Sequence, residues 1–456
     1  MLILPLAIAW LSALPLALLD GRRRWVGWLA VVALCGVFGS TLWLTIDVLN
    51  NGPRELVAGG WPHGIGIALR ADALGVVFAL VSSAVLLIAL VYEVLGGVHE
   101  RALPALVLFL ATGLTGLFIT GDAFNFYVFF EISMTTSFVL ATYGQRQREI
   151  RAALIFIVVN LLGSVLFLSA IAGLYHLTGT LDMQDLAAAA GSVEQNAITL
   201  TAVFIFVAFG VKLGLFPFHF WLPPVYRDTL PAVAAILSGA VANIGSYGLL
   251  RFGAGLLPRE LQLSSGVLIA LGAISILYGA FQAVSVRTAS EALAYSAIGQ
   301  AGYILVGLGI GGTVGFSAAI LFALINPLNK TLLFLATGVR GWLVGAAFAI
   351  GAFSVAGVPP SIGFFGKAAL FRAGLSENSI GLMLLLFVGG ALSFVYMFQI
   401  YQRVHWGRAL AIPVSPTSTR LLVLGVAALV IALGLWPEPL LLASQRAAEL
   451  LQRRPQ

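Results

Sequence analysis

Apolar segments of roughly 20 residues recur from one end of this 456-residue sequence to the other. A helix of about 20 apolar residues crosses the roughly 30 Å hydrocarbon core of a bilayer, and lipid offers no partner to an unpaired backbone group. The repetition therefore predicts an all-α polytopic membrane protein. The fourteen spans that we predict lie near residues 1–20, 26–48, 72–95, 102–119, 121–143, 151–176, 197–219, 229–252, 263–284, 290–310, 313–339, 342–373, 380–402 and 419–441.

The first span is expected to stay in the membrane as a helix. It reads "MLILPLAIAWLSALPLALLDGRRRW", with arginines after the apolar run and no small-residue cleavage site, unlike a signal peptide. Cys35 is the single cysteine, which excludes an internal disulfide and a cysteine metal cluster, and its apolar helix predicts a core position. No long polar loop separates the spans. We therefore expect no nucleotide or flavin domain, no cofactor and no metal.

Arginine supplies most of the charge in the predicted loops and indicates an orientation. One side carries Arg22, Arg23, Arg24, Arg101, Arg146, Arg148, Arg151, Arg227, Arg287, Arg340, Arg403, Arg408 and Arg420. The other carries Arg54, Arg70, Arg251, Arg259 and Arg372, then Arg446, Arg453 and Arg454 in the tail. The positive-inside rule makes the richer side cytoplasmic and turns both termini outward, although the basic tail opposes this orientation. Because these arginines sit in short loops, they indicate topology and not nucleic-acid binding.

The three lysines, Lys212, Lys330 and Lys367, all fall inside predicted spans. Arginine keeps its proton, whereas burial favours the neutral form of lysine, so a buried lysine can take up and release protons. A structural role, with each lysine paired to a carboxylate or to helix carbonyls, is the alternative. Because the chain uses lysine nowhere else, we favour a functional role, as is usual for ionisable groups inside a membrane.

Glu131 is the carboxylate that the sequence places clearly inside a span, in "GDAFNFYVFFEISMTTSFVLATYG". Near Lys212 it would stay ionised and hold the lysine charged, and separation of the two would let the lysine lose its proton. The sequence therefore predicts a switchable pair. A cluster of hydroxyl residues follows within the next two turns and consists of Ser133, Thr135, Thr136 and Ser137.

Further polar residues recur at helical spacing. They are Asn160 and Ser164 in 151–176, Asn243 and Tyr247 in 229–252, and Ser296, Gln300 and Tyr303 in 290–310. Each is typical of an interhelical hydrogen bond, and together they could line a water chain between the ionisable groups. His219, beside Trp221, is predicted near a membrane face, either as a group where protons enter or as an interfacial anchor.

Two proline-rich interruptions suggest an internal repeat. The span that holds Lys212 breaks at Pro217, and the overlong span 342–373 is interrupted at "GVPPSIGFFG", before Lys367. Interrupted helices at corresponding positions in two halves are typical of inverted-repeat transporters. We therefore divide the chain into N-terminal helices 1–100, a first five-helix repeat 101–255, an inverted second repeat 256–405, and a C-terminal helix and tail 406–456.

The sequence resembles the proton-translocating antiporter family shared by Mrp-type cation/proton antiporters and the membrane arm of respiratory complex I. The resemblance lies in "GDAFNFYVFFE", "VKLGLFPFHFWLPPVYRDTLPAVAAILSG", "EALAYSAIGQAGYI" and "GVPPSIGFFGK", between Asp122 and Lys367. The first motif looks most like the Mrp D-type subunits. Complex I paralogues commonly have tryptophan where this chain has Phe130.

The resemblance also implies roles for single residues. Glu131 and Lys212 match the family's ion pair, Lys330 its helix-eleven lysine, and Lys367 the terminal lysine of the second half-channel. This chain departs from the family at Asn243, where many members have lysine. It departs again at Phe322 and Asn326, where some members have histidine. The middle of the path thus lacks titratable groups, which puts continuous conduction between the halves in question.

Three functions remain open at this stage. The first is a proton-translocating subunit of a multisubunit Na⁺/proton antiporter, without enzymatic activity, in a bacterial cell membrane and with other antiporter subunits as partners. The second is an antiporter-like proton-pumping subunit of a complex I-type or hydrogenase-type redox complex, in which this chain binds no electron carrier. The third is a non-conducting scaffold, which the substitutions at Asn243, Phe322 and Asn326 motivate.

Overall fold

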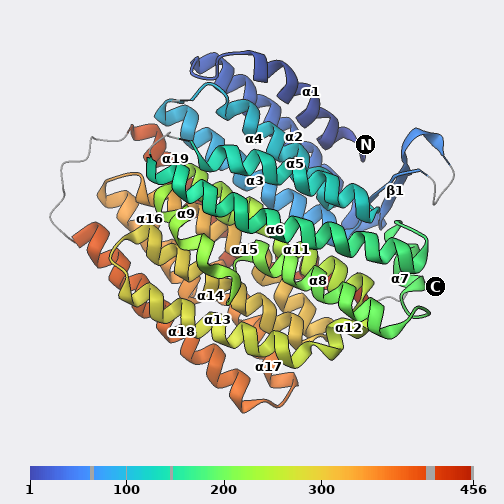
Figure 1. The fold of residues 1–456 in the computed structure, drawn as a ribbon. Helices are drawn as coiled ribbons and strands as arrows, with labels where there is room; N and C mark the ends of the chain where they lie inside the picture. The colour runs from blue at the N-terminus through green and yellow to red at the C-terminus, as the bar shows by residue number, and fades with distance from the viewer. Residues whose placement is uncertain (62–65, 99, 144–146, 407–415, 453–456) are drawn as a thin grey trace.

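The structure is a computed structural model that describes residues 1–61, 66–98, 100–143, 147–406 and 416–452 (Figure 1). Among these residues, eleven helices are long and apolar enough to cross a membrane, and three shorter apolar helices accompany them. An all-α polytopic membrane protein is therefore confirmed, while the count of fourteen crossings stays a prediction. The loop arginines Arg146, Arg408, Arg453 and Arg454 lie outside the described residues.

The helices and strands follow one another with these bounds. The N-terminal part contains α1 (Leu4–Leu18), α2 (Arg24–Asn51), β1 (Arg54–Val57), η1 (Ala58–Gly60), β2 (Ala68–Ala71), α3 (Ala73–Gly96), α4 (Leu103–Phe118), α5 (Ala123–Ala141), α6 (Gln147–Thr178) and α7 (Met183–Ala189). The middle contains α8 (Gln195–Leu213), η2 (Phe218–Trp221), α9 (Leu222–Asp228), α10 (Pro231–Ala235), η3 (Ile236–Val241), α11 (Asn243–Gly248), η4 (Leu249–Leu256), α12 (Pro258–Leu263) and α13 (Ser265–Ser285). The last part contains α14 (Ala289–Ile310), α15 (Gly312–Thr337), α16 (Trp342–Ala356), α17 (Ile362–Ser376), α18 (Ile380–Tyr401), η5 (Gln402–Trp406), α19 (Thr417–Leu435) and α20 (Glu438–Gln452).

The centre of the bundle is formed by α14, α15 and the segment Pro231–Leu256. The most apolar window of that segment is completely buried and that of α15 is 94% buried, against 28% for Ile380–Trp406. α15 packs against α14, α16, α17 and α20 and also touches α3, while α1, α2 and α18 lie at the edges of the view in Figure 1. Polar side chains in a helix that is buried on all sides do not contribute to solubility. Those in the central helices are therefore candidates for a functional role.

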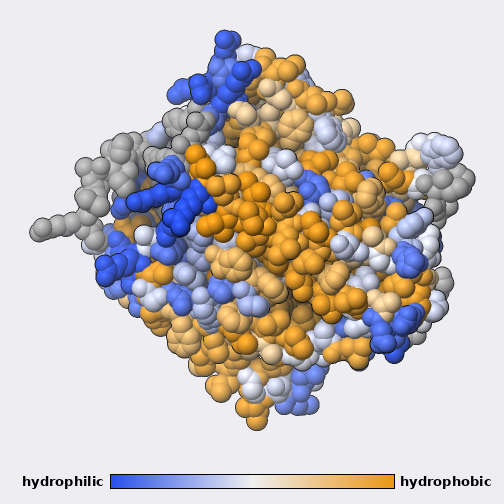
Figure 2. All heavy atoms as spheres, in the orientation of Figure 1, coloured by the Kyte–Doolittle hydropathy of each residue, from blue (hydrophilic) through white to orange (hydrophobic). Residues whose placement is uncertain are grey.

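The outer helices present an apolar surface. Figure 2 shows hydrophobic residues across the face over α6, with hydrophilic residues gathered toward its edges. Val158, Leu162 and Val165 of α6 are more than half exposed, as expected for side chains that face lipid. Cys35 is also exposed, on the outer helix α2, so the predicted core position was wrong. An apolar helix at the rim has one face without protein neighbours, and the sequence did not reveal which face that was.

Both predicted helix breaks are present. α8 ends at Leu213 and is followed by Gly214 with φ +69°, and α16 ends at Ala356 and is followed by Gly357 with φ +82°. This left-handed conformation favours glycine because it has no Cβ. After the first break the chain forms η2, a 3-10 turn, and α9; after the second it passes Pro359 and Pro360 into α17.

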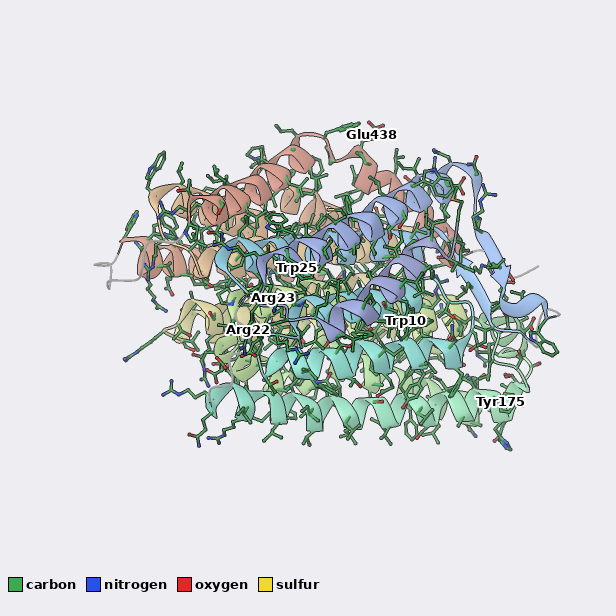
Figure 3. The ribbon with its side chains drawn as sticks, turned by 90° about the horizontal axis from the view of Figure 1, so that it is seen from above. Trp10, Arg22, Arg23, Trp25, Tyr175 and Glu438 are labelled. Carbon is green, nitrogen blue, oxygen red and sulfur yellow. The ribbon has the colours of Figure 1, made fainter. Side chains whose placement is uncertain are left out.

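Three features were not predicted. β1 and β2 form a short antiparallel hairpin in which Arg54 pairs with Ala71 and Val57 with Ala68, in addition to the helices. α20 packs against α15 and α3 beyond the last predicted span. η3 and η4 are π-helical, a distortion that often marks functional positions. Figure 3 shows the hairpin beyond one end of the bundle, on the side of Tyr175, and Arg22 and Arg23 where α1 joins α2.

Candidate functional site

All three lysines lie within buried helices, as predicted. Lys212 is 3% exposed in the last turn of α8, Lys330 is 8% exposed in α15, and Lys367 is 7% exposed in α17. None of them forms an ion pair with a carboxylate among the described residues at 4 Å or less. Each lysine therefore has to be understood from the neutral groups that it contacts.

Lys212 lies against soft and aromatic groups next to the break of α8. Its Nζ is 2.7 Å from Sδ of Met134 and 5.3 Å from the centre of the Phe156 ring. Met134 lies one turn after Glu131 on α5, so the lysine packs against the helix that carries its predicted partner. The Trp221 indole donates to the carbonyl of Val211 over 3.0 Å and so caps the end of α8 beside the lysine.

Glu131 is held by a different partner. Its Oε1 accepts a hydrogen bond from the hydroxyl of Ser164 on α6. Three members of the hydroxyl cluster after Glu131 bond elsewhere, because Ser133, Thr136 and Ser137 donate to carbonyls one turn back in α5. The predicted neighbours Glu131 and Lys212 are thus brought to one region, but in this structure each contacts another side chain.

Lys367 reaches back across the second break. Its Nζ donates to the carbonyl of Ala356 over 3.0 Å, at the end of α16, and lies 5.3 Å from the centre of the Tyr303 ring. The left-handed Gly357 permits this approach, since a Cβ there would lie 2.6 Å from Cδ of Lys367. The ammonium is therefore stabilised by a helix carbonyl end and an aromatic face.

The polar face of α14 leads toward Lys367. The Ser296 hydroxyl and the Tyr396 hydroxyl are 2.8 Å apart, and Gln300 follows Ser296 by one turn. The ring of Tyr303 packs on Phe322 of α15 with 5.1 Å between centroids, and Nζ of Lys367 lies over the same tyrosine ring. The predicted stripe is therefore real as a buried face, and its last member reaches a lysine.

Lys330 occupies the middle of the bundle. Its Nζ is 3.4 Å from the carbonyl of Ser238 in η3, a long hydrogen bond. Pro327 lies inside α15, so the carbonyl of Ala323 loses its usual helical donor. Ser238 in η3 and Asn326 and Asn329 in α15 each have a buried side-chain oxygen without a hydrogen-bond partner among the described residues. A buried polar group without a hydrogen-bond partner is destabilising unless it is hydrated. This region is therefore suited to binding water or another polar molecule.

The remaining predicted residues make mainly structural contacts. Asn160 donates to the carbonyl of Phe156, one turn back in α6, and Asn243 donates to the Ser82 hydroxyl of α3 over 3.3 Å. His219 lies in η2 and packs against Tyr278 with 4.5 Å between ring centroids. Its neighbour Trp221 is buried and 2% exposed. The broken helix folds it inward onto Phe156.

A buried ion pair was missed by the sequence analysis. Arg251, expected in a loop, lies in η4 and forms a two-point contact with Asp72, with both N–O distances 2.7 Å. Tyr247 accepts from the same guanidinium over 2.9 Å and donates to the carbonyl of Phe118 over 3.1 Å. The signal was present, because Asp72 caps α3 and Arg251 falls inside an apolar run, but their pairing across 179 positions was not predictable.

Glu93 is a further buried carboxylate. It is 8% exposed near the end of α3, and the Tyr143 hydroxyl is 3.4 Å from its Oε2. Glu131 is therefore not the only carboxylate inside a span. Across the described ranges, no three His, Cys, Asp or Glu side chains gather in a way that could hold a metal ion.

A family model and several known proteins match this chain. The model described as "NADH:quinone oxidoreductase/Mrp antiporter, TM" matches residues 120–341, which include Glu131, Lys212 and Lys330. The D-type subunit of the Na(+)/H(+) antiporter of Alkalihalophilus pseudofirmus is 31% identical over 432 residues, which cover 87% of each chain. The similarity therefore extends well beyond the single motifs.

Two solved structures superpose on nearly the whole length of this chain. A chain of the Mrp complex from a Dietzia species superposes with a TM-score of 0.89 at 25% identity, covering 98% of this chain and 97% of that one. A chain of respiratory complex I from Thermus thermophilus gives a TM-score of 0.80 at 26% identity, covering 96% of this chain and 99% of that one.

Proposed function

We propose, on the premise that this chain belongs to the NADH:quinone oxidoreductase/Mrp antiporter membrane-subunit family, that it is a proton-translocating subunit of a Na⁺/proton antiporter complex. In this proposal the chain is a transporter subunit and not an enzyme. It works in a bacterial cell membrane, surrounded by lipid and by the other subunits of its complex. Protons, and Na⁺ at the level of the complex, are the transported ions.

The observation that carries the proposal is the pair of broken helices, each with a buried lysine at a helix carbonyl end. Lys212 lies in the last turn of α8, and Lys367 contacts the last residue of α16. Backbone that leaves its helix within a membrane is tolerated where it lines a cavity or packs on protein. A lysine there can carry a proton, because burial favours its neutral form and the carbonyl end favours its charged form.

The first half works as a switch in this proposal. In the structure Glu131 binds Ser164 while Lys212 rests on Met134, so the pair is open. If Glu131 leaves Ser164 and approaches Lys212, both groups are charged and the lysine holds its proton. The open arrangement leaves the lysine without a counter-charge, and the closed arrangement gives up the hydrogen bond from Ser164. Because each arrangement has a cost, the pair suits an element with two states that neighbouring subunits can bias.

The second half passes the proton onward. Lys367 exchanges it at the second break, and the buried face of α14 with Ser296, Gln300 and Tyr303 leads to it. Lys330, in the second half, contacts the carbonyl of Ser238 in the first half. The side-chain oxygens of Asn326 and Asn329 in its own helix have no hydrogen-bond partner in the described part of the chain. Since an asparagine orients water but cannot hold a proton, transfer between the halves would depend on water at this place. The two five-helix repeats, 101–255 and 256–405, are the corresponding proposed halves.

Reconstitution tests this proposal. The complex, purified with its native partners into vesicles, should convert an imposed Na⁺ gradient into a pH gradient that an internal dye reports. The chain alone should show little exchange, because hard cations prefer several oxygen ligands and no multi-carboxylate site gathers in the described residues. Robust exchange by the isolated chain would contradict the requirement for partners.

The likeness to a complex I chain favours a second candidate, a proton-pumping subunit of a redox complex. Purification with native partners separates the two candidates. Co-purification of quinone- or iron–sulfur-binding subunits, with proton movement that requires an electron donor, supports the second. Exchange driven by a Na⁺ gradient without any electron donor supports the first.

A further inference from the structure

A basic cavity lies where the proposed halves meet at the arginine-rich side of the bundle. It has a volume of about 350 Å³, roughly ten times the share of one water molecule in the liquid. Three arginines from three different segments line it: Arg287 before α14, Arg340 after α15 and Arg403 in η5. The loops could each carry an arginine without bringing it to the same cavity. The convergence of three arginines from separate segments therefore needs an explanation.

The three guanidinium groups have no carboxylate partner among the described residues. Arg340 donates to the carbonyl of Val404 over 2.8 Å and Arg403 donates to the carbonyl of Val286, while no side-chain hydrogen bond of Arg287 is seen. The nearest acidic residue on α14, Glu291, lies 3.8 Å from Arg227 and accepts a hydrogen bond over 3.4 Å from Thr288, which also lines the cavity. Of the residues that the structure describes, three arginines and no acidic residue line the cavity, so its wall carries a net positive charge.

The other walls also supply donors. The amino end of α14, a helix of 22 residues, begins at Ala289 in the wall, and Ser290 follows it. Thr229 lines the cavity from the start of the segment that leads into α10, is only 9% exposed, and its hydroxyl has no partner among the described residues. Nε of Arg340 is likewise buried without a partner in the described part of the chain. Helix amino ends and arginine forks are the groups that proteins use to hold phosphate.

We infer that this cavity binds a phosphate group, held by Arg287, Arg340 and Arg403 at the amino end of α14. Two sources carry such a group at this level of the bundle, the headgroup of an anionic phospholipid and free phosphate. The bound anion ties α10, α14, α15 and α18 together at their ends. The site is independent of the transport proposal, because it needs none of the lysines.

Thermal unfolding of the full-length protein with its partners tests the site in two arms. The first arm compares nanodiscs of phosphatidylglycerol with nanodiscs of phosphatidylcholine. The second adds inorganic phosphate in detergent, with chloride replaced at constant ionic strength so that screening stays equal. Stabilisation only in the first arm assigns the lipid, and stabilisation in the second assigns free phosphate.

The decisive variant is Arg287→Gln, because it removes charge without removing an observed hydrogen bond. It should weaken binding of the stabilising anion about tenfold, the effect of one charge-assisted contact. Arg287→Lys should restore part of the loss. Arg259→Gln, which removes one charge from the other predicted side, is the matched control and should bind like the parent. Equal stabilisation of parent and Arg287→Gln, or none in either arm, would overturn the site.

Discussion

The two broken helices hold their lysines in opposite ways. Lys212 lies before its break, and Trp221 from beyond the break caps the carbonyl end of α8. Lys367 lies after its break and itself caps the carbonyl end of α16. The first lysine packs against the helix that carries a carboxylate, Glu131, whereas the second contacts neutral partners among the described residues.

This difference assigns different tasks to the two halves. A lysine with a movable counter-charge can be set to hold or release its proton by a change in one distance. A lysine that contacts a carbonyl and an aromatic ring has no counter-charge that can move. Whether it is protonated therefore depends on the groups that pass the proton to it. The first half is then the element that neighbouring subunits can control, and the second half is the element that exchanges protons.

The largest effect is expected from removal of either lysine. Lys212→Ala and Lys367→Ala should each lower transport by the complex about 100-fold or more, the usual contribution of a positioned proton-transfer group. Dye-monitored exchange in vesicles measures the loss, and co-purification of partners checks that assembly is intact. Lys367→Arg should fail as well, because arginine keeps its proton. Full transport in Lys367→Ala would remove the second half from the path.

A smaller effect, confined to the first half, is expected from Glu131→Gln. An opposite charge at close range changes the ratio of charged to neutral lysine about tenfold or more, so transport should fall by at least that factor. Because Glu131 and Lys212 act through one coupled step, the double variant Glu131→Gln with Lys212→Ala should be no worse than Lys212→Ala. Losses that multiply would show that the two residues act separately. The proposed difference between the two halves would then be contradicted.

The sequence predicted the helices and breaks well because their causes are local. Apolar runs set the spans, and glycine and proline at 214, 217, 357, 359 and 360 set the interruptions, so each can be seen in a short window. The same holds for the lysines, since a charge in an apolar run is buried with that run. This is why the location of every lysine could be predicted before any contact was known.

The contacts of those lysines were not predictable for the same reason. Met134 and Lys212 are 78 positions apart, Glu131 and Ser164 are 33 apart, and Asp72 and Arg251 are 179 apart. Which of several polar residues on a helix face meets a partner depends on the rotation and tilt of both helices, which packing decides. Ser133, Thr136 and Ser137 illustrate the point, because they are nearer to Glu131 in sequence yet bond to their own helix.

The smallest effect is expected at Ser164, and it tests most directly whether the first half contains a switchable pair. The Ser164 hydroxyl holds Glu131 away from Lys212 in this structure, so Ser164→Ala should free the carboxylate to approach the lysine. The charged state of the pair is then favoured, and the lysine releases its proton at higher pH than in the parent. Transport should drop by about tenfold or less, since the carboxylate keeps its charge and the net contribution of a typical hydrogen bond is about 0.5–1.5 kcal/mol. Its pH profile should move toward alkaline pH. Ser164→Thr keeps the hydroxyl and should restore the parent profile, while Ser169→Ala removes an exposed hydroxyl that donates to its own helix α6 and serves as the matched control. An unchanged pH profile in Ser164→Ala, with a rate loss equal to that of the control, would show that Ser164 only fills space beside Glu131.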